Sequence, residues 1–115
     1  MKYRAKRLNR NTEKFYVGED LELTYYIVDE NDNIVYDLSD FTFTAKLYSD
    51  GDSGLEFDEA TYMTVSDEKV TVSIPNTSTI DFVYEERYIF ELSATENSKK
   101  HVLLREEIYF GRELS

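Results

Sequence analysis

Six of the thirteen basic residues of this chain lie in its first fourteen positions. They are Lys2, Arg4, Lys6, Arg7, Arg10 and Lys14. Because only Glu13 opposes them, this segment carries a charge of +5, whereas the other 101 residues carry −16 and bring the net charge to −11. A basic segment joined to an acidic body predicts binding to an anionic surface, including the body of a neighbouring copy.

The basic segment also carries apolar side chains. In an extended conformation Lys2, Arg4 and Lys6 would share one face, and Tyr3 and Ala5 the other. This alternation suits an edge strand that adds to another sheet through backbone hydrogen bonds, and a flexible tail that orders on binding is equally compatible. We therefore predict a basic arm over residues 1–12. The predicted protein-interaction residues are Lys2, Tyr3, Arg4, Lys6, Arg7, Leu8 and Arg10.

Catalytic chemistry has little support in the sequence. The single histidine, His101, follows two lysines at an expected hairpin end, and nothing nearby in the sequence would orient it as a general base. A glycosidase needs two carboxylates across a cleft, but with 24 acidic residues some pair will always be close. We predict a protein without enzymatic activity, catalytic residues or a cofactor.

The acidic loop Asp29–Asn33 offers a cluster of oxygen ligands. Asp29 and Asp32 are weak candidates for calcium ligands, because calcium binds about six to eight oxygens and other acidic loops would have to converge on them. A hairpin loop in which Asp and Asn side chains cap their own backbone explains the same residues. We favour the hairpin loop and predict no metal site.

Alternation of apolar and polar residues with a period of two runs through most of the chain, which is typical of half-buried strands. The predicted strands cover residues 21–28, 41–48, 70–74, 88–95 and 102–110. Clusters of Gly, Asp, Asn, Ser and Pro separate them and predict turns. We expect one helical turn, over residues 78–84. The pattern predicts an all-β, immunoglobulin-like antiparallel sandwich of about seven or eight strands over residues 13–115, preceded by the extended basic arm.

Tyr88 is a further sign of such a sandwich, because it opens a strand after the turn-rich segment 75–87. Immunoglobulin-like domains often place a tyrosine there, hydrogen-bonded across the corner. An ordinary core tyrosine fits the position equally well.

Composition and charge argue against several kinds of chemistry, segment and partner. Cysteine is absent, so disulfide and thiol chemistry are excluded. The N-terminal charges are not followed by an apolar stretch, so we expect no signal peptide, and the longest uncharged apolar run, Tyr25–Val28, cannot span a membrane. An acidic body repels nucleic acid and anionic lipid, so we predict neither as a partner.

Five segments together resemble a known family. They are Tyr16–Leu23, Val28–Asn33, Tyr36–Phe43, Val70–Pro75 and Glu86–Leu92. Their order and composition, over roughly residues 15–110, look like the immunoglobulin-like N-terminal domain of tailed-phage baseplate upper proteins and related phage β-sandwich modules. The basic arm is not part of this resemblance, and the long helical and receptor-side extensions of those proteins have no counterpart in this chain.

The resemblance implies a non-enzymatic structural protein of a phage or prophage virion, made in the host cytoplasm. It would dock onto a baseplate, tail, neck or capsid through contacts with other virion proteins, and a homo-oligomer is expected. A ligand-binding adhesion module, for a glycan or a calcium-dependent contact, is the first alternative. A small bacterial regulator or inhibitor is the second.

Overall fold

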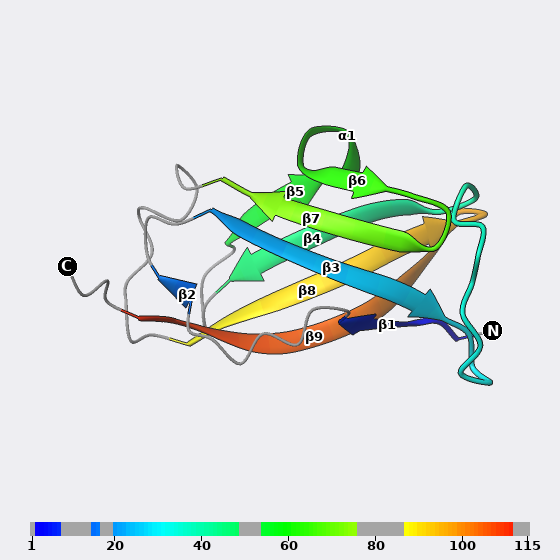
Figure 1. Ribbon diagram of the computed structural model, residues 1–115, viewed down its shortest axis with the longest axis horizontal. Helices are drawn as coiled ribbons and strands as arrows, with labels where there is room; N and C mark the ends of the chain where they lie inside the picture. The colour runs from blue at the N-terminus through cyan, green and yellow to red at the C-terminus, as the bar shows by residue number, and fades with distance from the viewer. Residues whose placement is uncertain (1, 8–14, 17–19, 49–53, 76–86, 112–115) are drawn as a thin grey trace.

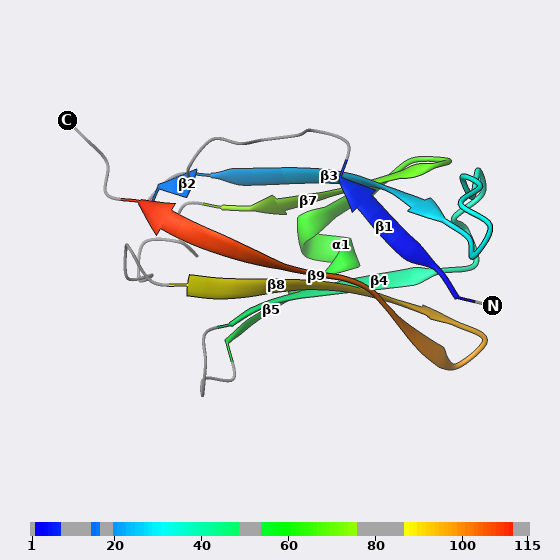
Figure 2. The same ribbon diagram turned by 90° about the horizontal axis from the view of Figure 1, so that it is seen from below.

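The computed structural model describes residues 2–7, 15–16, 20–48, 54–75 and 87–111. These residues form two facing β-sheets, which Figure 1 shows from the side of the smaller sheet and Figure 2 shows edge-on. The predicted all-β sandwich is therefore confirmed.

The smaller sheet has four antiparallel strands in the order β1-β3-β7-β6. Their bounds are β1 Arg4–Arg7, β3 Leu21–Val28, β7 Lys69–Ile74 and β6 Met63–Val65. The predicted strands over residues 21–28 and 70–74 are confirmed.

The larger sheet has five strands in the order β2-β9-β8-β4-β5. Their bounds are β2 Phe15–Tyr16, β9 Lys99–Gly111, β8 Arg87–Glu96, β4 Thr42–Tyr48 and β5 Leu55–Asp58. Strand β2 runs parallel to β9, and the other neighbours are antiparallel. The chain thus adds its first strand to one sheet and its second strand to the other.

The core lies between the sheets, where alternate side chains of β3, β4, β7 and β8 meet. Tyr25 of β3 stacks on Phe90 of β8 with 6.0 Å between the ring centroids. Both of these side chains are fully buried. Other core side chains with no exposure are Leu23, Ile27, Phe43, Val70, Val72, Ile74 and Leu92. Their burial is what the period-two pattern predicts.

Strand β9 departs from strict alternation. A register shift opposite Leu92 and Ser93 inserts an extra residue, so that Leu104 pairs with Leu92 while Val102 pairs with Ser93. This β-bulge turns Leu103 into the core, where it is 5% exposed, and leaves Val102 44% exposed. Val102 and Leu104, which strict alternation in the predicted strand 102–110 would place on one face, therefore lie on different faces.

The end of β3 also differs from the pattern, which places Val28 among the outward residues. Val28 is only 2% exposed. It forms a bridge with Ile34, and the Val35 amide donates to the Ile27 carbonyl oxygen at 2.9 Å. The chain after the Asp29–Asn33 turn therefore folds back along the end of β3.

One connection between the sheets contains a helix that the sequence pattern does not predict. Helix α1, Glu59–Tyr62, connects β5 to β6. Asp58 caps it by accepting a hydrogen bond from the Thr61 amide at 3.0 Å, and Glu59 accepts one from the Phe43 amide at 2.9 Å. The helical turn expected over residues 78–84 lies outside the described residues.

The turn between β8 and β9 has two residues with left-handed backbone, Asn97 at φ 51° and Ser98 at φ 66°. Such a two-residue turn matches the right-handed twist of the strands, and it favours Asn-Gly because glycine adopts positive φ without a steric cost.

We expect Ser98→Gly to raise the free energy of unfolding by about 0.5–1 kcal/mol, because it relieves this backbone strain. Urea denaturation measures the change. The matched control is Ser73→Gly in β7, which should destabilise the protein, since glycine weakens a strand interior. A destabilised Ser98→Gly protein would contradict the strain argument.

Candidate functional site in the basic N-terminal strand

The predicted arm is part of the sandwich. Residues Arg4–Arg7 form β1, which pairs antiparallel with β3 from Arg4 opposite Val28 to Arg7 opposite Tyr25. Ala5 joins the core at 6% exposure. An arm lying outside the domain over residues 1–12 is therefore wrong for Arg4–Arg7. The physical reason is that the apolar face of this segment finds an open edge within its own chain, without the entropic cost of association.

The predicted division of the segment into two faces is confirmed. Arg4 and Lys6 are exposed, whereas Ala5 is buried and Tyr3 is half-buried. The Tyr3 ring packs edge-on against Phe41 at 5.1 Å and against His101 at 5.2 Å between centroids. Tyr3 thus packs against side chains of its own domain.

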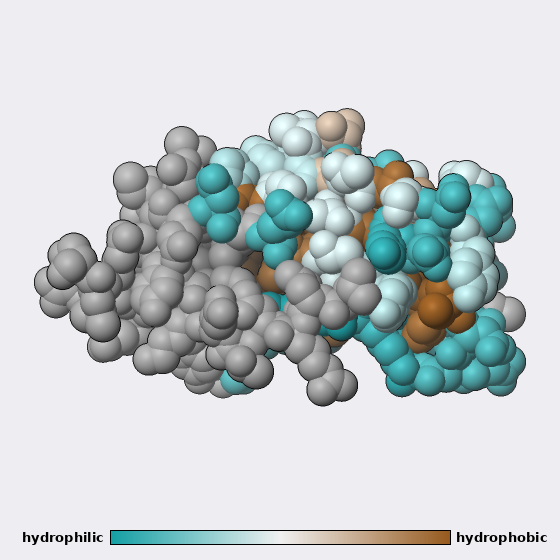
Figure 3. All heavy atoms as spheres, viewed as in Figure 1, coloured by the Kyte–Doolittle hydropathy of each residue, from teal (hydrophilic) through white to brown (hydrophobic). Residues whose placement is uncertain are grey.

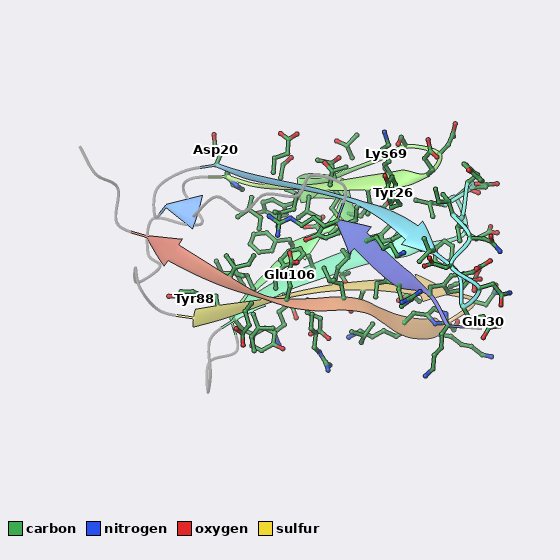
Figure 4. The ribbon with its side chains drawn as sticks, turned by 60° about the horizontal axis from the view of Figure 1, so that its bottom comes forward. Asp20, Tyr26, Glu30, Lys69, Tyr88 and Glu106 are labelled. Carbon is green, nitrogen blue, oxygen red and sulfur yellow. The ribbon has the colours of Figure 1, made fainter. Side chains whose placement is uncertain are left out.

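Arg7 continues the inward face and reaches the opposite sheet. Its Nη1 atom lies 3.1 Å from Oε1 of Glu106 in β9, and the Tyr25 hydroxyl donates to the same oxygen at 2.9 Å. Figure 4 shows Glu106 between the two sheets. The Arg7 and Glu106 side chains are only 18% and 22% exposed. This cluster joins β1 to both sheets.

The titration of Tyr25 follows from this environment. Burial first, and then the charge and hydrogen bond of Glu106, raise the pKa of its hydroxyl well above the ordinary value, although Arg7 acts in the opposite direction. Tyr25 therefore stays a neutral hydrogen-bond donor to the carboxylate.

On the outward face Arg4 and Lys6 share one carboxylate. The side chain of Asp32 lies 2.9 Å from Arg4 Nη2 and 2.8 Å from Lys6 Nζ. The hydrogen bond from Lys6, helped by the charges of Lys6 and Arg4, lowers the pKa of Asp32. All three side chains are about half exposed, so a competing carboxylate can reach the two cations.

The loop considered for calcium has its oxygens engaged in other contacts. Asp29 Oδ1 accepts hydrogen bonds from the amides of Asn31 at 2.9 Å and Asn33 at 3.0 Å. Asp32 accepts from Arg4 and Lys6. This is the self-capping hairpin that we favoured. Within the described residues no three potential metal-ligating side chains gather into a group.

A row of side chains across the smaller sheet extends the outward cations. Lys6 lies opposite Tyr26, and Tyr26 lies opposite Lys69 of β7. Figure 4 shows Tyr26 and Lys69 side by side. We call Arg4, Lys6, Tyr26 and Lys69 the basic face. Figure 3 views this sheet from outside; its described part shows mostly hydrophilic and weakly polar side chains with apolar atoms between them, and the largest apolar patch lies towards the end where β1 begins. Nothing in the sequence groups Tyr26 and Lys69 with Lys6, because their proximity depends on strand order.

The end of the sandwich beside β1 is hollowed. An open pocket of about 460 Å³ is lined by Lys2, Tyr3, Arg4, Glu30, His101 and Val102. His101 is the third residue of β9, and its Nε2 atom lies 3.9 Å from Oε1 of Glu96. The expected position of His101 at a hairpin end is confirmed. Its ring serves as a packing partner for Tyr3.

Two of the predicted interaction residues, Leu8 and Arg10, lie outside the described residues. Tyr88 is a core residue at 7% exposure, and most of the segment that its hydroxyl would cross in a tyrosine corner lies outside the described part. A comparison with protein-family models and with curated proteins finds no match to this chain. None of the helices in the described residues has the length and apolar character needed to cross a membrane.

We expect Arg7→Met to lower the free energy of unfolding by about 2–3 kcal/mol, because it leaves the Glu106 carboxylate between the sheets without its cation. The partial exposure of both side chains places the effect below that of a fully buried pair. Chemical denaturation measures it. Arg4→Met, which removes an exposed cation from the same strand, should change stability little. Equal effects of the two variants would refute the internal role of Arg7.

Tyr25→Phe should remove a stabilisation that depends on pH. The raised pKa of Tyr25 in the folded state means that this stabilisation is fully present below about pH 10, the ordinary pKa of tyrosine, and is lost as the pH rises above it. Urea denaturation from about pH 8 to about pH 11 should show the difference between wild type and Tyr25→Phe shrinking. Tyr36→Phe, at an exposed position, is the control. A difference that does not change with pH would contradict the burial of an ionisable Tyr25.

Proposed function

We propose that this chain is an immunoglobulin-like interaction domain. The strand order supports this proposal. In the immunoglobulin arrangement, strands A, B, E and D form one sheet, and G, F and C form the other, with C′ added in variable-type domains. The order β1-β3-β7-β6 corresponds to A-B-E-D, and β9-β8-β4-β5 to G-F-C-C′. The parallel pairing of β2 with β9 is explained by a first strand divided between the sheets.

We further propose that the domain is a structural component of a tailed-phage or prophage virion and has no enzymatic activity. The resemblance to baseplate upper proteins carries this part. Its segments fall on β2 and β3, on the Asp29–Asn33 turn, on the start of β4, on β7 and on β8. Docking onto other virion proteins is the corresponding role.

The docking surface is the basic face. Arg7 and Ala5 serve the interior, so the binding cations are Arg4, Lys6 and Lys69, with Tyr26 as an amphipathic contact between two lysines. An acidic partner would displace Asp32 from Arg4 and Lys6. Exposed ion pairs contribute only about 0–1 kcal/mol each, so these cations must act together. Screening beyond about 8 Å allows them to act locally on a chain that is acidic overall.

Docking cannot be tested by removing the predicted arm, because Arg4–Arg7 belong to the smaller sheet. Deleting residues 1–12 removes β1, the buried Ala5 and the cation of Glu106, so we expect a destabilised domain rather than a folded domain that merely fails to assemble. Substitutions on the basic face test docking without this complication.

The decisive experiment is to induce a prophage in the host that carries the gene and to purify the resulting particles on a density gradient. An immunoblot should detect the chain in the particle fraction. Lys6→Glu combined with Lys69→Glu should remove it from the particles, whereas the exposed control Lys99→Glu should not. Absence of the wild-type chain from particles would refute the virion role. Retention of the double variant would refute the basic face as the docking surface.

A further inference from the structure

The outer face of the larger sheet carries four charged side chains in one row across four strands. Glu56 of β5 lies opposite Lys46 of β4, Lys46 lies opposite Glu91 of β8, and Glu91 lies opposite Arg105 of β9. We call these four residues the charge ladder. They point away from the core because their strand neighbours, among them Ala45 and Phe90, are buried. The charges alternate as −, +, −, +.

The charges of the ladder are only partly paired within the chain. Arg105 Nη2 lies 3.2 Å from Oε1 of Glu91. The Lys46 ammonium lies 5.3 Å from the centroid of the Tyr48 ring. Glu56 is exposed at the edge strand, and the Arg105 side chain is 62% exposed. The two outermost charges of the row therefore remain accessible to a partner.

The charges around the ladder are close to balanced. The chain carries −11, but among the side chains that the structure describes the outward charges on this face nearly cancel. The acids are Glu56, Asp58, Glu91 and Glu107, and the bases are Lys46, Lys100 and Arg105. Close approach of two chains at this face thus avoids bringing an excess of like charge together in the contact itself.

An alternating row of four charges is complementary to itself when it is reversed. A two-fold axis parallel to the strands, passing between β4 and β8, brings a second copy face to face and reverses its row. Glu56 then meets Arg105 of the second copy, and Lys46 meets its Glu91, so that all four contacts join opposite charges. We propose that this face is the interface of a homodimer, with a second copy of the chain as its occupant.

A neighbouring row fits the same axis. Tyr48 lies opposite Ile89 within the chain, so the reversal places Tyr48 against Ile89 of the second copy, twice by symmetry. The aromatic–aliphatic contact beside the ladder is compatible with a closely packed interface.

This interface is separate from the basic face, which lies on the outer side of the other sheet. Dimerisation can therefore be tested independently of virion docking. A chain that dimerises without entering particles would refute only the proposed function, and a monomer that enters particles would refute only this inference.

The experiment uses the full chain in sedimentation equilibrium with three preparations, Glu56→Arg, Arg105→Glu and a 1:1 mixture of both. In each single variant like charges meet across the two-fold axis, so the dimer dissociation constant should rise at least about tenfold. In the mixture all four contacts are again of opposite sign, so a heterodimer should form with nearly wild-type affinity. Asp67→Arg and Lys2→Glu are controls matched in charge change, and both should dimerise normally.

Both ladder substitutions are at exposed positions, so we expect both proteins to fold, and circular dichroism checks this. Lys46→Glu and Glu91→Lys form a second complementing pair on the central contacts, again predicted to associate only when mixed. A wild-type chain that is monomeric at about 1 mM would overturn the inference. So would a mixture that dimerises no better than its separate components.

Discussion

Glu106 places a carboxylate between the two sheets, and this constraint determines the role of the N-terminal strand. A charge held away from water is costly unless a cation and hydrogen-bond donors surround it. Arg7 supplies the cation from β1, and Tyr25 supplies the hydroxyl from β3. The first and last strands of the described chain thus depend on each other. The sandwich is complete only when the basic segment is docked on its own body.

The basic residues at the start of the chain have two different roles in the fold. Arg7 pairs with the Glu106 carboxylate between the sheets, while Arg4 and Lys6 share Asp32 at the surface. The smaller sheet then presents Arg4, Lys6 and Lys69 beside the acids Glu22 and Asp32, and the larger sheet presents the balanced charge ladder. An acidic chain therefore has two surfaces on which its net charge does not prevent association.

Most of the sandwich could be predicted from the sequence because alternation reports directly on which side of a strand is buried. The β-bulge at Leu103 could not be predicted, because an extra apolar residue cannot be recognised in a run of Val, Leu and Leu. The outside placement of the arm failed because the sequence does not show which sheet edge an extended segment will join. A usable signal was present in Leu104, Glu106 and Ile108, whose alternation puts a carboxylate on the buried face and so implies an internal cation.

The two surfaces lie on opposite sides of the sandwich, and this arrangement limits what an assembly could look like. A dimer closed through the charge ladder buries the larger sheet of each copy and leaves both basic faces pointing outward in opposite directions. Such a dimer has two binding surfaces for acidic partners. Binding of one face raises the effective concentration of the other, so weak exposed contacts can together give firm attachment. A monomer would have to rely on a few cations, whose individual contributions are small.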